Sequence, residues 1–192
     1  MPPQDQPANP TTLGLMVFGM TTILLSLMNL NVVDATLEGS LLLPMAIFSG
    51  GIVQLIAGGM AFKRGEMFAA TAFSAYGSFW EVLAFYWLLR TIGIATSASS
   101  RALASFMIVW GMFSFFMWIL TFKHSWNLVF VFGTLWLTFF LLAAHAIRGA
   151  EVLLRWAGYF GLVCGILAMW AAFCAIFFDH TGKELPGSGR PL

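Results

Sequence analysis

Six apolar stretches, each long enough to cross a lipid bilayer, limit what this chain can fold into more than any other feature. A membrane-spanning helix needs about 20 predominantly apolar residues. A charged residue directly follows each stretch, and the stretches are Leu13–Val33, Leu41–Phe62, Met67–Leu89, Ala102–Phe122, Asn127–Ile147 and Trp156–Phe178. They lack the strict alternation of membrane β-strands, and a helix satisfies its backbone hydrogen bonds within itself. The sequence therefore predicts an all-α membrane protein with six transmembrane helices in one bundle.

The composition excludes a water-soluble protein. Of the 192 residues, 60% are hydrophobic and only 9% are charged, whereas about a quarter of the residues in a soluble domain are charged. With a formal net charge of +1, the chain also lacks the basic surface that nucleic-acid binding requires. We therefore expect a multi-pass protein of the cell membrane (the inner or plasma membrane), with the lipid bilayer as its surroundings and no nucleic-acid partner.

An even number of spans places both ends of the chain on the same side of the membrane. Five Lys and Arg residues outside the spans fall on that side and four fall on the other, so the positive-inside rule slightly favours cytoplasmic termini. The chain is predicted to divide into a polar N-terminal segment at 1–12, a six-helix transmembrane domain at 13–178 and a disordered polar tail at 179–192. Small residues recur every four positions at Ala157, Gly161 and Gly165, a spacing that predicts close helix packing.

Catalysis would need a cluster of reactive side chains that this sequence does not contain. It has no zinc-protease motif, no paired aspartates at a workable spacing and no nucleophile elbow. The two cysteines, Cys164 and Cys174, are ten residues apart in one apolar stretch, and we interpret both as small packing residues. An enzyme is therefore not expected, and neither is a metal ion or an organic cofactor. A transport path, a receptor and a purely structural protein remain.

The start of the first span carries a helix-start signal. Asn9 is a favoured N-cap residue, and Pro10 suits the first helical position because its missing N–H would be unpaired there anyway. The amides of Thr11 and Thr12 then lie at the positive end of the helix, where an anion can bind. The pattern fits a simple helix cap equally well, and both interpretations stay open.

Two blocks of the sequence resemble one known family. The first is NPTTLGLMVFGMTTILLSLMN at 9–29, and the second is GGIVQLIAGGMAFKRGEMFAATAFSAYGSFW at 50–80. Both resemble the acetate uptake transporter family, the group of succinate–acetate permeases and yeast ammonia/acetate exporters. The first block departs from the family pattern at Thr11, at Thr12 and at Val17, and it keeps Asn9, Pro10, Leu13, Gly14, Leu15 and Phe18.

The resemblance implies a function and a set of site residues. Members are six-helix channels or permeases for acetate and related small carboxylates, often including succinate, and their transport is channel-like or proton-coupled. They form homo-oligomers, specifically hexamers, in which each protomer has its own path. A hydrophobic constriction of one Phe, one Tyr and one Leu narrows that path. Carried over to this chain, the constriction residues are Phe18, Tyr76 and Leu135.

Hydroxyl groups lie one helical turn from two of these residues. Thr21 and Thr22 follow Phe18 at three and four positions, and Thr138 follows Leu135 at three positions, so each shares a helix face with its constriction residue. Apolar constrictions gate by dewetting and polar groups set selectivity. We expect these threonines to line the path and the Tyr76 hydroxyl to offer the solute a hydrogen-bond donor.

Two further polar residues lie inside predicted spans. The amide of Gln54 would be costly in hydrocarbon without a partner, so it either bonds across helices or lines the path. The carboxyl group of Glu81 is a candidate for proton coupling, because carboxyl groups at membrane depth are commonly functional. Glu81 is five residues beyond Tyr76, about 140° around a helix, and is therefore expected to face another helix or a subunit interface.

Two other functions remain open from the sequence. The same scaffold could pass another small solute, such as ammonium. The chain could also be a membrane receptor or assembly protein that passes nothing.

Overall fold

The computed structural model describes residues 8–33 and 41–189, and within these ranges the chain forms six helical rods. One rod is the continuous run of α2 (Leu42–Met45), η2 (Ala46–Val53) and α3 (Gln54–Lys63), and the others are α1 (Pro10–Asn29), α4 (Met67–Thr91), α5 (Ser100–Thr121), α6 (Trp126–Arg148) and α7 (Glu151–Thr181). The predicted all-α fold with six helices is confirmed. Residues 1–7 of the predicted N-terminal segment and 190–192 of the predicted tail lie outside the described ranges.

Five of the six rods are long and apolar enough to cross a membrane, and α4 is the exception. α4 has 25 residues, but its sequence includes Glu81, Arg90 and several hydroxyl-bearing residues. Ten of its residues are buried against the rest of the chain. A helix that is covered by its neighbours needs less apolar surface than one that faces lipid all round, which accounts for the more polar composition of α4.

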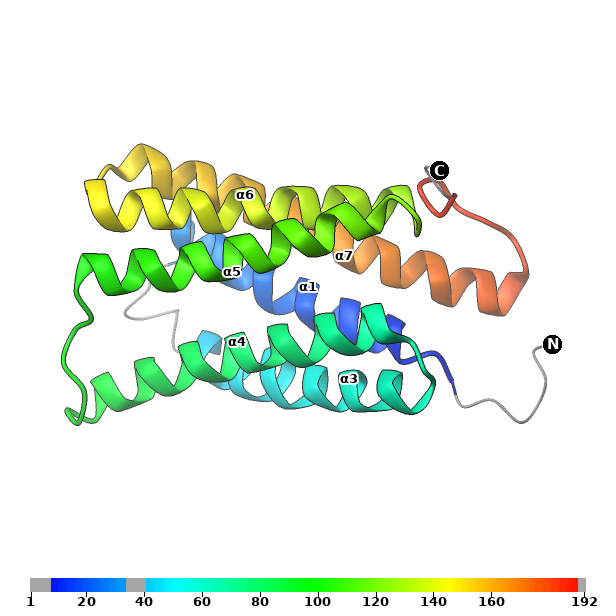
Figure 1. Ribbon diagram of the computed structural model, residues 1–192, viewed down its shortest axis with the longest axis horizontal. Coiled ribbons are helices and arrows are strands. Elements are labelled where there is room, and N and C mark those ends of the chain that lie inside the picture. The colour runs from blue at the N-terminus through cyan, green and yellow to red at the C-terminus, as the bar shows by residue number, and fades with distance from the viewer. Residues whose placement is uncertain (1–7, 34–40, 190–192) are drawn as a thin grey trace.

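The rods alternate in direction, so the start of α1 and the end of α7 lie at the same end of the bundle (Figure 1). We call this the terminal end. The connections from α3 to α4 and from α5 to α6 also lie at the terminal end, whereas those from α4 to α5 and from α6 to α7 lie at the opposite end. α1, α4 and α6 therefore all begin at the terminal end.

Local hydrogen bonds and turns move several helix ends away from their predicted positions. α1 begins at Pro10 rather than Leu13, because the Asn9 side chain accepts a hydrogen bond from the Thr11 N–H at 2.9 Å and caps the helix. α1 ends at Asn29 rather than Val33. α7 continues to Thr181, where Gly182 ends it in the left-handed conformation with φ 68°, a common way for a helix to stop.

The described part of the polar tail lies against the first turn of α6. The carbonyls of Gly187 and Gly189 accept hydrogen bonds from the N–H groups of Asn127 (3.0 Å) and Trp126 (3.1 Å). The Pro186 carbonyl accepts a hydrogen bond from the Trp170 indole at 3.2 Å. The first N–H groups of any helix have no partner within it, so the tail supplies partners for two of them.

Glycines bring α1 and α7 to backbone contact. A Cβ atom on Gly19 would lie 2.6 Å from the Gly165 carbonyl oxygen, and a Cβ atom on Gly165 would lie 2.8 Å from the Gly19 carbonyl oxygen. Towards the opposite end, Gly158 and Gly161 lie against Ser26 of α1. The spacing of small residues in the last span therefore supports close packing, as predicted.

The second rod packs on α4 in the same way. A Cβ atom on Gly50 of η2 would lie 2.7 Å from the Trp80 ring, and Gly58 of α3 lies against Ser74. The η2 segment is a π-helix, a wider turn that is rare in proteins. The close approach of this rod fixes one face of α4 and leaves the other face to meet α1, α5 and α6.

Large aromatic side chains fill the space between α4 and α5. Phe79 of α4 stacks on Phe106 of α5 with ring centroids 5.7 Å apart, and it meets Trp110 edge-on at 5.2 Å. One turn earlier, Tyr76 meets Phe113 edge-on at 5.3 Å. These two helices are therefore separated by side chains, in contrast to the glycine contact between α1 and α7.

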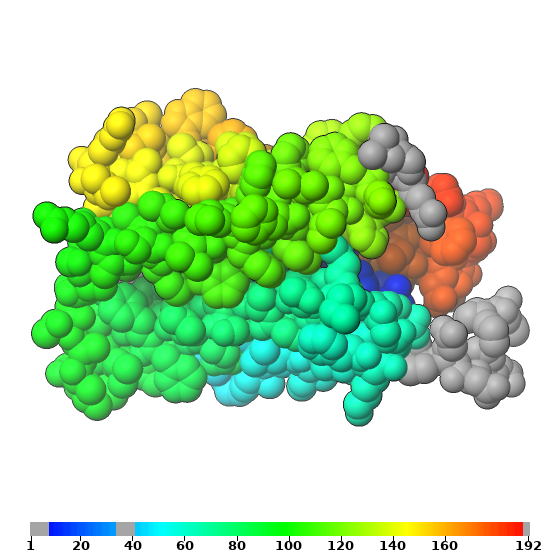
Figure 2. All heavy atoms as spheres, viewed as in Figure 1, coloured from blue at the N-terminus to red at the C-terminus, as the bar shows by residue number. Residues whose placement is uncertain are grey.

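The outer surface is apolar, as a surface that faces lipid requires. α5, in green, runs along much of the face seen in Figure 2. Its exposed large apolar side chains are Ile108, Val109, Met112, Phe115, Phe116, Ile119 and Leu120. A continuous patch of this kind is unusual on a soluble monomer and agrees with a helix in contact with lipid.

We predict that Gly19→Ala destabilises the protein, because the added methyl group meets backbone atoms of α7 that cannot move aside. Overpacking of this kind costs about 1–3 kcal/mol. The measurement is the thermal unfolding midpoint of the purified protein in detergent. Gly59→Ala is the matched control, since a Cβ atom there meets nothing within 4 Å. Equal midpoints for the two variants would contradict the proposed α1–α7 contact.

Candidate solute path

Three helices present continuous stripes of residues to the interior of the bundle. Successive stripe residues are three or four positions apart, which keeps them on one face of a helix. The stripes consist of Thr11, Leu15, Phe18, Thr22, Leu25 and Asn29 on α1, of Phe68, Ala72, Tyr76, Phe79, Leu83 and Tyr86 on α4, and of Leu128, Phe132, Leu135, Phe139 and Leu142 on α6. Each stripe runs from the terminal end of its helix to the opposite end.

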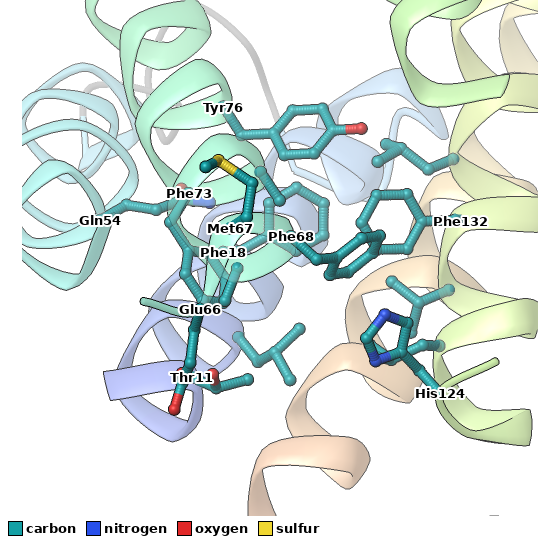
Figure 3. A pocket seen from close by; sticks show the side chains of 16 residues that line it. Thr11, Phe18, Gln54, Glu66, Met67, Phe68, Phe73, Tyr76, His124 and Phe132 are labelled. Carbon is teal, nitrogen blue, oxygen red and sulfur yellow. The ribbon is translucent and has the colours of Figure 1, made fainter. Parts of the chain in front are cut away.

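Two cavities lie along these stripes. The proximal cavity, nearer the terminal end, has a volume of about 300 Å³ (Figure 3) and is lined by Thr11, Leu15, Phe18, Gln54, Glu66, Met67, Phe68, Ala69, Ala72, Phe73, Tyr76, His124, Leu128, Val131, Phe132 and Leu135. The distal cavity has a volume of about 250 Å³ and is lined by Phe18, Thr22, Leu25, Ser26, Asn29, Tyr76, Phe79, Trp80, Leu83, Tyr86, Trp87, Arg90, Leu103, Met107, Leu135, Thr138, Phe139 and Leu142.

The two linings have three residues in common, and these are Phe18, Tyr76 and Leu135. All three side chains are buried. Phe18 lies eight positions into α1, and Tyr76 and Leu135 each lie nine positions into their helices. At 1.5 Å per residue, all three are about 12–14 Å from the terminal end of their helices. They therefore lie at the same depth, between the two cavities.

Aromatic contacts hold this level of the bundle together. The ring centroids of Phe18 and Tyr76 are 5.6 Å apart, with an angle of 47° between the ring planes. On the other side, Tyr76 meets Phe132 of α6 at 6.1 Å. Two turns before Tyr76 on α4, Phe68 lies 5.5 Å from Phe132 and 4.5 Å from the His124 ring. The separation between the cavities is thus built from large apolar side chains.

The Tyr76 hydroxyl does not offer its proton to the cavities, contrary to our expectation from the sequence. It donates a hydrogen bond to Ser114 Oγ of α5 at 2.9 Å. In Figure 3 the hydroxyl points away from Gln54, towards the side of the cavity on which Phe132 lies. The surface that Tyr76 presents between the cavities is therefore mainly that of its ring.

Polar side chains are sparse in the proximal cavity. Gln54 is fully buried in its wall, and neither its Oε1 nor its Nε2 atom has a hydrogen-bond partner among the described residues. It enters the cavity from the side opposite Phe132 and His124 (Figure 3). Glu66 Oε1 accepts a hydrogen bond from Arg64 Nε at 2.8 Å. The Gln54 amide is therefore the deepest polar group on this side of Phe18, Tyr76 and Leu135.

The distal cavity contains two of the predicted threonines. Thr22 is buried in its lining, and its hydroxyl has no partner among the described residues. Thr138 also lines the cavity, and its hydroxyl donates to the Thr134 carbonyl at 2.9 Å. Near the opposite end of the bundle, the Arg90 guanidinium lies 5.8 Å from the centre of the Tyr86 ring, a distance that permits a cation–π interaction.

Three other predicted residues lie outside both linings. Asn9 caps α1, and its carbonyl accepts a hydrogen bond from the Thr12 hydroxyl at 3.0 Å. Thr21 is fully buried against Gly50 of η2, and its hydroxyl donates to the Val17 carbonyl at 2.9 Å. Thr12 also lies outside both linings, so that among the predicted residues at the start of α1 only Thr11 lines the proximal cavity. The structure thus separates Thr21 from Thr22, although both follow Phe18 by one turn.

Glu81 lies on the far side of α4 from the cavities, and it lines neither of them. Its carboxylate packs against Gly51 of the π-helix η2. Glu81 Oε1 is buried without a hydrogen-bond partner among the described residues. The expectation that Glu81 faces another helix and not the Tyr76 side of α4 agrees with this position.

Several residues of this region did not emerge from the sequence. Phe68 lies two turns before Tyr76, and Phe132 lies one turn before Leu135, so the helical spacing could have identified both. His124 lies in a loop and Ser114 lies on α5, which contributes no constriction residue. No spacing in the sequence relates these two to Tyr76, since their proximity depends on which helices are neighbours.

Comparison with known proteins gives relatives along nearly the whole chain. Residues 1–182 match the model of the GPR1/FUN34/yaaH family. The chain is 40% identical over 178 residues to the succinate-acetate/proton symporter SatP of Escherichia coli, and the match covers 93% of each protein. It is 32% identical to ammonia transport outward protein 3 of Saccharomyces cerevisiae, with 93% of this chain and 70% of that protein covered.

A solved structure has the same fold. The structure of the bacterial acetate channel SatP is similar to this one with a TM-score of 0.91 at 39% sequence identity, covering 96% of this chain and 100% of that chain. The family resemblance carried by the two sequence blocks is confirmed. Transport proteins make up these matches, which agrees with the expectation that the chain is not an enzyme. The chain belongs to the GPR1/FUN34/yaaH family and is a multi-pass membrane protein of the transporter and channel class.

Proposed function

We propose that this protein passes acetate and related small carboxylates, including succinate, across the membrane through the proximal and distal cavities. Phe18, Tyr76 and Leu135 form the constriction between them. The observation that carries this proposal is that the two cavity linings share these three residues and no others. The succinate–acetate symporter and acetate channel among the similar proteins support the choice of solute.

The chemistry of the path suits a small weak anion or its neutral acid. The constriction contacts a methyl group with apolar side chains, and an apolar constriction limits passage by dewetting. The side chains of Thr11 and Gln54 offer hydrogen bonds in the proximal cavity, and Thr22 offers one in the distal cavity. No Lys or Arg lines the proximal cavity within the described residues. In the proximal cavity a solute can therefore bind weakly enough to leave again, as conduction requires, and the distal cavity has Arg90 in its lining near the opposite end of the bundle.

One protomer supplies the whole path. The stripes lie on α1, α4 and α6 of a single chain, so no residue from a second copy is needed to form the constriction. We therefore propose that the protein is a homo-oligomer, specifically a hexamer, in which every protomer has its own path. Measuring the mass of the detergent-solubilised protein would test the number of protomers. Cytoplasmic termini remain a prediction from charge.

We predict that Phe18→Ala and Leu135→Ala widen the constriction, so that larger acids pass more readily. The measurement is the initial rate of uptake of labelled acetate and succinate into liposomes that contain the purified protein. The ratio of the succinate rate to the acetate rate is expected to rise severalfold. Phe85→Ala is the matched control, since Phe85 lies on the outer face of α4 and is 53% exposed.

Three outcomes of this assay would count against the proposal. An unchanged rate ratio in both variants would remove Phe18 and Leu135 from the constriction. Ammonium flux without carboxylate flux would indicate another solute on the same scaffold. No flux of any solute through the wild-type protein would favour a receptor or an assembly protein.

We predict that Gln54→Leu lowers acetate flux without lowering the thermal unfolding midpoint. The Gln54 amide has no protein partner among the described residues, and a buried polar group without a partner costs about 1–3 kcal/mol. Leucine removes that cost together with the group that would bind the solute. A lower midpoint would indicate that Gln54 is held by structural hydrogen bonds. Ile56→Ala, an exposed position on α3, is the control for flux.

Glu81 is the candidate for proton coupling, separate from the solute path. The described parts of α1, α2 and η2 carry no charged residue, and on α3 the charged residue is Lys63 at the terminal end. An ionised carboxylate without a partner is costly at membrane depth, so Glu81 is expected to carry a proton there. Its neighbour Gly51 lies in the rod that also carries Gln54, and this rod connects Glu81 to the proximal cavity.

We predict that Glu81→Gln, which mimics the protonated carboxyl group, flattens the pH dependence of acetate uptake. The measurement is the initial uptake rate at two external pH values. Glu151→Gln, at the exposed start of α7, is the control and should retain the wild-type dependence. Wild-type pH dependence in Glu81→Gln would exclude this residue from coupling.

A further inference from the structure

We infer that Ser114 is a positioning residue that sets the size limit for solutes by holding the Tyr76 ring in the constriction. This inference rests on the proposed function, because a size limit has meaning only if small carboxylates pass through the constriction. Ser114 is fully buried on α5 and lines neither cavity. Any influence of Ser114 on a solute must therefore act through Tyr76.

Two consecutive hydrogen bonds connect Tyr76 to the backbone of α5. The Tyr76 hydroxyl donates to Ser114 Oγ at 2.9 Å, and Ser114 Oγ donates to the Trp110 carbonyl at 2.8 Å. A hydroxyl group has one proton to donate. Because Ser114 donates its proton to Trp110, its oxygen acts as the acceptor for Tyr76, and the direction of both bonds is set.

Packing alone does not hold the Tyr76 ring in one orientation. Its aromatic neighbours are Phe18 at 5.6 Å, Phe113 at 5.3 Å, Trp110 at 6.1 Å and Phe132 at 6.1 Å. Contacts between aromatic rings are satisfied over a range of tilts, whereas a hydrogen bond is directional. The bond to Ser114 therefore selects one position of the ring among those that the neighbours allow.

There is space for the ring to move if this bond is lost. Tyr76 borders the proximal cavity on one side and the distal cavity on the other. Without Ser114 Oγ as acceptor, the hydroxyl would turn towards another polar partner and the ring would tilt towards one of the cavities. The gap between Phe18, Tyr76 and Leu135 would then be less narrow, and acids longer than acetate would pass.

The test is a double-mutant cycle in liposomes with wild type, Ser114→Ala, Tyr76→Phe and the double variant. Tyr76→Phe keeps the ring and removes the hydroxyl. The readout is the ratio of succinate to acetate initial rates. We expect each single variant to raise this ratio severalfold, and the double variant to match Tyr76→Phe, since both changes remove the same bond. An unchanged ratio in Ser114→Ala, or effects that multiply in the double variant, would overturn the inference.

Thr121→Val is the matched control for loss of a buried hydroxyl on α5. Thr121 is fully buried, and its hydroxyl donates to the carbonyl of Trp118 in the same helix at 2.6 Å. It lines neither cavity, so the rate ratio should stay at the wild-type value. If Ser114→Ala does not fold, Tyr76→Phe tests the bond from its other end, and an unchanged ratio there also overturns the inference. Absence of wild-type acetate flux would instead contradict the proposed function.

Discussion

The unequal spacing of the helices is the constraint on which the rest of the structure depends. At Gly19 and Gly165, α1 and α7 meet at backbone distance, and glycines bring the second rod close to α4. Between α4 and α5 the space is filled by large rings such as Phe79 and Trp110. Helices that meet at glycines are close together, whereas α4 and α5 are held apart by aromatic rings. This unequal spacing leaves two cavities in the interior of the bundle. Tyr76 and Phe18 separate them because both are large and lie at the same depth.

The polar groups along the interior are few, and most belong to their own helices. Hydroxyls such as those of Thr21 and Thr138 donate to carbonyls one turn earlier, which satisfies them without a partner across the bundle. The exceptions are Gln54 and Thr22, which face the cavities without protein partners among the described residues. An interior of this kind offers a small acid few hydrogen-bond partners, which suits the proposed passage because conduction requires that the solute can leave again.

The sequence predicted the number and order of the helices more accurately than the residues at which they begin and end. Length and hydropathy account for five of the six helices, because these properties depend on the bilayer, whereas the more polar α4 is covered by neighbouring helices. The observed helix ends differ from the predicted ones where local hydrogen bonds set them, as at the N-terminus of α1, which Asn9 caps. Only the family resemblance identified Phe18, Tyr76 and Leu135 and suggested that they meet. Helical periodicity added the threonines that follow Phe18 and Leu135 by one turn. Periodicity did not separate Thr21 from Thr22, although Thr21 lies against η2 and Thr22 lines the distal cavity.

The sequence by itself determined that the chain forms six long helices, five of them apolar enough to cross a membrane, with a carboxyl group at Glu81 inside the more polar one. These properties are local, and each can be recognised along one helix. Only the tertiary structure decided which stripes face each other, and that the Tyr76 hydroxyl is bonded to Ser114 on α5. The reason is physical. Helix–helix contacts depend on the summed shapes of side chains from segments far apart in the chain, and no periodicity within one segment encodes its neighbour.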